Sequence, residues 1–108
     1  MTLTRDPTPL LKFGKGGKPG FRAFTLSPDL LALTWQSKNK AASKTRVDIK
    51  DMKEIRYGQR TEKFKKNNRP DLENLSFSIM YVDREANGAI ESLDLVCRDE
   101  SEFQMWYV

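Results

Sequence analysis

Four cationic side chains are grouped on and beside a short glycine-rich segment near the start of the chain. Residues 12–22 read Lys-Phe-Gly-Lys-Gly-Gly-Lys-Pro-Gly-Phe-Arg, so Lys12, Lys15, Lys18 and Arg22 are interspersed with four glycines. Phosphate oxygens accept charge-assisted hydrogen bonds about twice as strong as neutral ones. Glycine-rich backbone can add N–H donors to such a site. The segment therefore predicts a binding site for a compact, multiply charged anion such as a phosphate group.

The elements around this segment must form a hairpin for the cations to converge. Four glycines and Pro19 exclude a helix over residues 14–20. Residues 10–13 before the segment and residues 21–26 after it read as strands. The cations are thus expected at the tip and base of a β-hairpin.

Alternation of apolar and polar residues predicts further strands along the chain. They are expected at residues 31–36, 46–49, 54–57, 75–81 and 93–97. Asn87-Gly88 is a hairpin signal between the last two. Residues 61–66 could form one helical turn with Thr61 as its N-cap, inside the otherwise irregular stretch 59–74.

The end of the chain changes to a helical period. Asp99 and Glu102 resemble a capping box, and Phe103, Trp106 and Tyr107 fall on one helical face. About seven short strands followed by one amphipathic helix predict a mainly β fold, a small antiparallel barrel or sandwich whose open end or edge the helix covers.

The length and composition of the chain exclude or disfavour several classes of function. The chain has 108 residues, one domain's length, and holds neither an apolar run long enough to span a membrane nor a targeting peptide. It has no histidine and a single cysteine, Cys97, which we expect to be buried in a strand. An internal disulfide and a zinc-knuckle framework are excluded, and an enzyme or a metal centre is disfavoured. We therefore predict no cofactor and no catalysis by this domain, although its parent protein could be an enzyme.

Charge is distributed unevenly along the chain. Residues 1–66 hold 16 Lys/Arg and 6 Asp/Glu, whereas residues 67–108 hold 3 and 9, which together give the net charge of +4. This asymmetry predicts a surface attracted to anions, with ordinary solvated faces as the alternative. Nucleic-acid binding is not expected, because neither a recognition helix nor an exposed aromatic platform accompanies the basic residues.

Taken together, these segments resemble the pleckstrin homology (PH) domain. The chain resembles the subtype found in phosphoinositide-specific phospholipases C and in plant proteins with RCC1 repeats and a FYVE finger. The resemblance covers roughly residues 9–108, and residues 1–8 before it are expected to be a flexible lead-in. The segments that carry it are Leu10-Leu11-Lys12, the basic glycine turn, residues 21–26, Leu33-Thr34-Trp35, Val47-Asp48-Ile49, residues 55–61, residues 76–79, Ser92-Leu93-Asp94-Leu95 and Trp106. The resemblance implies a seven-stranded, partly open barrel capped by a C-terminal helix.

The resemblance also implies a ligand and its contacts. In lipid-binding members the first hairpin and the turn between the third and fourth strands hold an inositol phosphate head group. By position, the implied head-group residues are Lys12, Lys15, Lys18, Arg22, Lys38, Lys40 and Ser92. Gly20 stands where strong binders carry a further basic residue, and Pro19 removes a backbone donor, so binding is predicted to be weak and poorly selective. The implied partners are a phosphoinositide or inositol phosphate and an anionic membrane surface, with a cytoplasmic, peripherally membrane-associated location.

Several alternatives remain open from the sequence. The domain could instead bind proteins, with little or no lipid selectivity. Lys12 could be a solvated outward residue, and Lys63, Lys65 and Lys66 are expected to be a solvated loop face. Phe13 could be core or could face a bilayer. Family helices usually continue beyond the tryptophan, so a sequence ending at Val108 is expected to be a fragment of a larger protein, and its short helix could support a homodimer.

Overall fold

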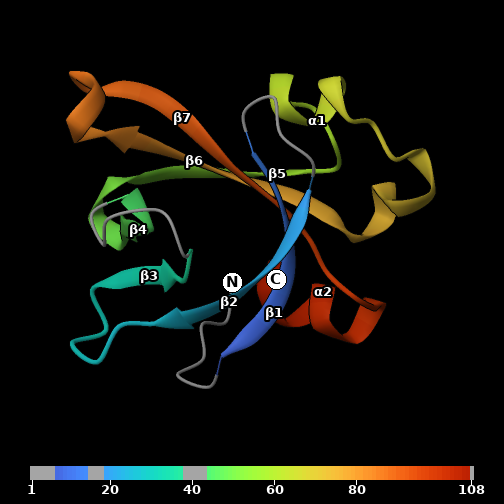
Figure 1. Ribbon diagram of the computed structural model, residues 1–108, viewed down its shortest axis with the longest axis horizontal. Helices are drawn as coiled ribbons and strands as arrows, with labels where there is room; N and C mark the ends of the chain where they lie inside the picture. The colour runs from blue at the N-terminus through green and yellow to red at the C-terminus, as the bar shows by residue number, and fades with distance from the viewer. Residues whose placement is uncertain (1–6, 15–18, 38–43, 108) are drawn as a thin grey trace.

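The computed structural model describes residues 7–14, 19–37 and 44–107 and shows, within these ranges, one seven-stranded antiparallel sheet. The strands are β1 (Thr8–Phe13), β2 (Gly20–Leu26), β3 (Ala32–Trp35), β4 (Arg46–Asp48), β5 (Met52–Tyr57), β6 (Ser76–Asp83) and β7 (Ala89–Val96). Their order is β4-β3-β2-β1-β7-β6-β5, so β4 and β5 are the edges. Figure 1 shows the sheet bending, so that β5–β7 lie across β1–β4. The predicted mainly β fold is confirmed.

Two α-helices accompany the sheet in the described part of the chain, α1 (Glu62–Lys66) and α2 (Glu100–Tyr107). Short 3₁₀ turns lie at η2 (Ile49–Asp51), η3 (Pro70–Leu75) and η4 (Arg84–Ala86). The start of α2 agrees with the predicted cap, because the Glu102 amide donates to Asp99 Oδ1 at 2.8 Å. No helix in the described ranges is long and apolar enough to cross a membrane.

The main core lies on the inner face of the bent sheet and is closed by α2. The helix contributes Phe103 and Trp106, which are 7% and 0% exposed. The rings of Phe24 and Trp35 lie 5.2 Å apart within this core. The other large members are Leu10, Leu33, Val47, Phe77, Ile79, Leu93, Leu95 and Cys97. The predicted burial of Trp35, Phe77, Cys97 and Trp106 is confirmed, while the side chain of Tyr107 lies outside the described residues.

A second, smaller core lies on the outer face of the sheet, where α1 packs against β1 and β7. It consists of Phe13, Phe64 and Val96, each at most 2% exposed. The rings of Phe13 and Phe64 lie 4.9 Å apart. Of the two alternatives for Phe13, core or facing a bilayer, the structure shows the core position. The contact between Phe13 and Phe64 also fixes α1 beside the end of β1 that leads into the first hairpin turn (Figure 1).

The structure differs from the predicted elements at several boundaries. Ile49 lies in η2 and Cys97 follows the end of β7, so both residues were predicted in strands but lie just outside the observed β4 and β7. The stretch read as irregular contains η3 as well as α1. Thr61 does occupy the N-cap of α1, but it makes no side-chain cap bond, because its hydroxyl donates to Asp94 instead.

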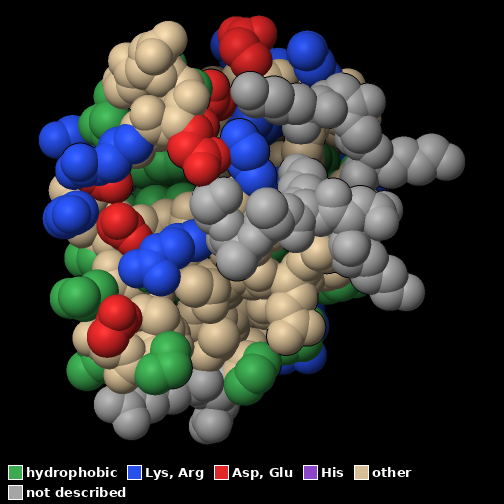
Figure 2. Space-filling view, turned by 60° about the vertical axis from the view of Figure 1, so that its left-hand side comes forward, with side chains coloured by type: hydrophobic (Ala, Val, Ile, Leu, Met, Phe, Trp, Pro, Cys, Tyr) green, Lys and Arg blue, Asp and Glu red, His purple; other side chains and the backbone are tan. Residues whose placement is uncertain are grey.

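The basic and acidic parts of the sequence meet in space. Arg84 forms a two-pronged pair with the buried carboxylate of Asp51, with an Nη2–Oδ1 distance of 2.9 Å. Lys44 lies 2.8 Å from Glu85. Figure 2 shows Lys/Arg and Asp/Glu side chains adjoining one another on one face of the molecule. Where these pairs form, the charge asymmetry along the sequence is locally compensated.

Candidate functional site

The first hairpin directs two of the predicted site residues to the inner face of the sheet. Leu10 pairs with Arg22, and Lys12 pairs with Gly20. Paired residues of an antiparallel ladder share a face, as do residues two apart in a strand. Because Leu10 is fully buried in the inner core, Lys12 and Arg22 lie on the same inner face, towards the turn of the hairpin.

Lys12 is held against the core. Its Nζ lies 5.8 Å from the centroid of the Trp35 ring, a cation–π contact worth about 0.5–1 kcal/mol at an exposed site. The ammonium also lies 3.9 Å from the place that a Cβ on Gly14 would take. Lys12 is half-buried. The alternative of a solvated outward residue is therefore wrong, and the positive charge points along the inner face toward the start of the turn.

Arg22 reaches the other end of the same turn. Its Nη1 donates to the Phe21 carbonyl at 2.8 Å. A Cβ on Gly20 would come within 2.9 Å of Nη1, so a side chain at position 20 would displace the guanidinium. Gly20, which departs from the pattern of strong binders, thus leaves room for Arg22 to place its charge beside position 20.

The remaining basic residues of the predicted site are Lys15, Lys18, Lys38 and Lys40, and all four lie outside the described residues. The structure therefore brings together Lys12 and Arg22 and leaves the other four as predictions. Glycines at both ends of the turn keep backbone close to the two described cations, an arrangement suited to a phosphate group.

Ser92 lies on the opposite face. It pairs with Met80 across β6 and β7, and it alternates with Leu93, which points into the inner core. Its hydroxyl donates to Asp94 Oδ2 at 2.7 Å. The structure thus separates Ser92 from Lys12 and Arg22 by the thickness of the sheet.

Asp94 is the centre of a buried polar network under α1. Its carboxylate is fully buried and accepts hydrogen bonds from Thr61 Oγ1 at 2.5 Å and from Ser78 and Ser92 Oγ at 2.7 Å each. Lys63 Nζ lies 3.8 Å from Oδ2 and donates to the Ser92 carbonyl at 2.5 Å. The network ties α1 to β6 and β7, so Lys63 is half-buried, in contrast to the exposed Lys65 and Lys66.

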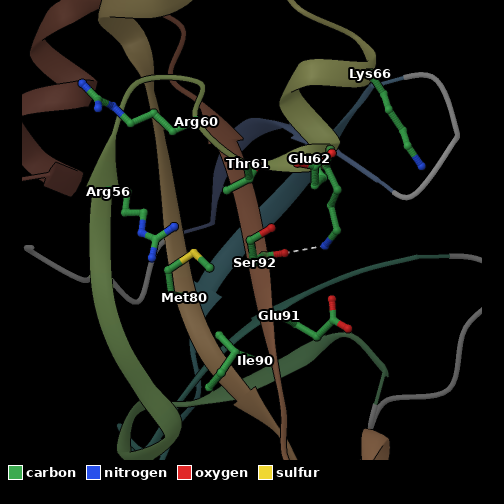
Figure 3. Close-up of a pocket in the computed structure, with 10 residues that line it drawn as sticks. Arg56, Arg60, Thr61, Glu62, Lys66, Met80, Ile90, Glu91 and Ser92 are labelled. Atoms are coloured by element: carbon green, nitrogen blue, oxygen red, sulfur yellow. Dashed lines mark hydrogen bonds between the residues drawn. The ribbon is translucent and has the colours of Figure 1, made fainter.

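An open hollow of about 480 Å³ lies beside this network on the outer face (Figure 3). Its lining comes from β5, α1 and its preceding loop, β6 and β7. The residues are Arg56, Arg60, Thr61, Glu62, Lys63, Lys66, Met80, Ile90, Glu91 and Ser92. Ser92 is the one member of the predicted head-group site among these lining residues. The signal in the sequence was the group of lysines at positions 63, 65 and 66, which were predicted to be a solvated loop face.

Two side chains, Tyr81 and Cys97, have raised pKa values, and burial is the main cause of both shifts. Burial, followed by the charge of Asp83, raises the pKa of Tyr81 to about 12. Burial also raises the pKa of the Cys97 thiol to about 12, with a smaller contribution from Glu102. Both groups are therefore neutral at physiological pH. Among the described residues, no group of three or more His, Cys, Asp or Glu side chains could hold a metal ion.

Comparison with known proteins identifies a family whose fold agrees with the seven-stranded sheet and C-terminal helix. The family model described as "Pleckstrin homology domain" matches residues 7–107. Human inactive phospholipase C-like protein 1 is 39% identical over 87 residues, which cover 79% of this chain and 8% of that protein. Human inactive phospholipase C-like protein 2 is 34% identical over 87 residues, which cover 79% of this chain and 7% of that protein. The chain thus spans less than a tenth of the length of these relatives.

Proposed function

The chain belongs to the pleckstrin homology domain family, and from this premise we propose that it binds a phosphoinositide head group and thereby brings its parent protein to a cytosolic membrane surface. One observation carries the proposal. Lys12 and Arg22 share the inner face of the first hairpin, and their charged ends lie beside Gly14 and Gly20, at the two ends of the turn. Two fixed cations beside a glycine-rich turn match the charge and size of a phosphate group.

The proposed ligand contacts come from two connections. Lys12 and Arg22 act from the strands, Lys15 and Lys18 from the turn between them, and Lys38 and Lys40 from the β3–β4 connection. Arg22 supplies a planar fork that can bind two phosphate oxygens, whereas lysines supply mobile point charges. With Gly20 and Pro19 in the turn, the proposed binding is weak and poorly selective. The domain itself performs no catalysis in this proposal.

Calorimetric titration with a soluble inositol trisphosphate tests the proposal. Lys12→Met and Arg22→Met keep much of each side chain's apolar length while they remove its charge. Because a hydrogen bond to a charged group contributes about 1.5–3 kcal/mol, each variant should weaken binding by about 10-fold or more. Lys50→Met is the matched control, since Lys50 is exposed at η2. Wild-type affinity in the double variant, with unchanged thermal stability, would refute the inner-face site.

Protein binding is a second candidate function, favoured by an exposed apolar patch. Leu30, Leu31 and Ile49 are 46%, 62% and 38% exposed, and the Ile49 amide donates to the Leu31 carbonyl at 2.9 Å. Leu30 has a φ of 64°, an uncommon conformation for a non-glycine residue. If the patch joins two copies, Leu31→Glu abolishes self-association in sedimentation velocity. If the dimer forms through α2 instead, Met105→Glu does so.

A further inference from the structure

β5 is an edge strand of the sheet, and among the described strands it has a neighbour, β6, on one side only. The Gly58 amide, just beyond β5, donates to the Ser76 carbonyl at 2.8 Å, in line with the register of the β5–β6 ladder. In an antiparallel ladder, hydrogen-bonded pairs alternate with non-hydrogen-bonded pairs. Glu54 and Arg56 therefore direct their backbone groups to β6, and Ile55 between them directs its N–H and C=O to the open side of the sheet.

The β6–β7 ladder gives the same direction for Ile55. The Cys97 amide donates to the Leu75 carbonyl at 2.8 Å, so the residues of β6 at steps of two from Leu75 bond to β7. Ile79 is one of these residues, and it stands opposite Ile55. Since the backbone of Ile79 bonds to β7, the backbone of Ile55 has no partner in β6. A donor and an acceptor in the middle of β5 can thus bond to another strand.

Opposite charges flank Ile55 along β5. Ile55 packs against the inner core, so the side chains of Glu54 and Arg56 lie on the outer face. Both are exposed, and Arg56 Nη2 lies 2.7 Å from Glu54 Oε1. Charged side chains commonly protect a sheet edge from pairing with other chains. Here the two charges have opposite signs and are equally distant from Ile55 along the strand. A second copy of β5 running antiparallel, with Ile55 opposite Ile55, would therefore meet each charge with its opposite.

An open hollow of about 420 Å³ beside β5 offers room for a second strand. Its lining residues are Arg56, Tyr57 and Arg60. Because Arg56 and Tyr57 are consecutive in a strand and face opposite sides of the sheet, a hollow that both line lies along the edge of β5. Figure 3 shows β5, which carries Arg56, at the border of the sheet, and the end of Arg60 directed to that side, away from Lys66. The edge of β5 thus offers two arginines to an incoming carboxylate.

We propose that two copies of this domain associate through their β5 edges, which form an antiparallel pair centred on Ile55. The Ile55 N–H of each copy donates to the Ile55 carbonyl of the other. Glu54 of each copy lies opposite Arg56 of the other, at the hollow that Arg60 also lines. The same surface is used twice, as the two-fold symmetry of a homodimer requires. The interface is one short strand from each copy, so the association is weak and depends on protein concentration. It is independent of the proposed head-group site, which lies on β1 and β2.

Sedimentation velocity with charge-reversal variants tests the pairing. Self-association of the wild type is expected at roughly 0.1–1 mM protein, since the interface is small. Glu54→Arg and Arg56→Glu each turn both cross-strand pairs from attraction into repulsion, so each should weaken self-association by about 10-fold or more. An equimolar mixture of the two variants should recover wild-type association, because one strand then carries two positive charges and the other carries two negative charges.

Two further proteins serve as controls. Glu54→Arg/Arg56→Glu keeps both cross-strand pairs with their signs exchanged and should associate like the wild type. Asp71→Arg breaks an exposed pair with Arg69 that also spans two residues, but outside β5, and should change association no more than about twofold. A wild type that is monomeric up to about 1 mM, or a mixture of the two β5 variants that does not associate, would overturn the proposal. So would an association that Leu31→Glu abolishes and Glu54→Arg leaves intact, since the interface would then be the exposed apolar patch.

Hydrogen exchange followed by NMR tests whether the contact lies on β5. In the monomer the Ile55 amide is not bonded to β6, so its exchange should be fast in dilute protein and slower as the protein concentration rises. The Arg56 amide bonds to β6 and should exchange at the same rate throughout, which makes it the reference. In Glu54→Arg the Ile55 amide should exchange fast at the same concentrations. An Ile55 amide whose exchange does not slow while the wild type associates would put the interface elsewhere and refute the proposed pairing.

Discussion

Replacing Asp94 should destabilise the domain far more than replacing a surface acid. Its fully buried carboxylate accepts three hydroxyl hydrogen bonds and lies 3.8 Å from Lys63 Nζ. Asp94→Ala leaves three donors without their acceptor in a site closed by α1. At about 1 kcal/mol for each donor, the free energy of unfolding should fall by about 3 kcal/mol. With an unfolding entropy of about 2.1 cal/mol/K per residue, the melting temperature should fall by about 13 °C for 108 residues.

Differential scanning calorimetry measures this change, and two further variants sharpen it. Asp94→Asn keeps Oδ1, which accepts from Thr61 and Ser78, but replaces Oδ2 near Lys63, so it should cost about half as much. Asp71→Ala removes an exposed pair with Arg69 and should cost less than about 1 kcal/mol. If Asp94→Ala lowers the melting temperature no more than Asp71→Ala does, the network does not hold α1 and the reasoning is wrong.

Three further predictions concern groups elsewhere in the fold. Because burial raises the pKa of Cys97 to about 12, its thiol should react with a disulfide reagent at pH 8 at least about tenfold more slowly than in the unfolded chain, since the loss of thiolate outweighs its higher nucleophilicity; absorbance follows the reaction. Burial raises the pKa of Tyr81 from 10.0 to about 12, so Tyr81 stays protonated in the folded state at pH values where the unfolded chain has lost this proton. The free energy of unfolding should therefore fall as pH rises from 10 to 12. Urea midpoints should fall less steeply with rising pH in Tyr81→Phe than in the wild type. Gly58 has a φ of 83°, so Gly58→Ala should lower the free energy of unfolding by about 1–2 kcal/mol. The new Cβ would lie 2.4 Å from Glu73 Oε1, so part of this loss should disappear when Glu73→Ala is added. Denaturant titration of the single and double variants measures both effects.

The sequence predicted the strands well because their burial follows the period of two. In β6 and β7, Phe77, Ile79, Leu93 and Leu95 alternate with polar residues and all four enter the inner core. The same parity could have placed Ser92 on the outer face, away from Lys12, since Ser92 alternates with Leu93. The family resemblance implies a head-group contact for Ser92, whereas the strand pattern and the structure place it on the outer face.

The face of Lys12 could not be read in the same way. Leu10, Leu11 and Phe13 are apolar on both faces of β1, because the inner core packs on one face and α1 on the other. Only the cross-strand register and the position of α1 decide which face is which. The burial of Asp94 could not be predicted from the strand pattern either. A carboxylate in an alternating strand is expected to face solvent, but in the structure α1 covers this side chain.

The inner-face cations are already held in place before any ligand arrives, and Arg22 keeps donors for a phosphate. Arg22 uses one of the five N–H donors of a guanidinium in its bond to the Phe21 carbonyl. Lys12 is held by its contact with the face of the Trp35 ring. Gly20 allows this arrangement, because a side chain there would collide with Arg22 Nη1 at 2.9 Å. The glycine that removes a basic residue from the turn therefore also positions the arginine beside the gap, so Gly20→Ala should displace the guanidinium and weaken inositol phosphate binding, whereas an affinity equal to wild type would show that Arg22 needs no such space.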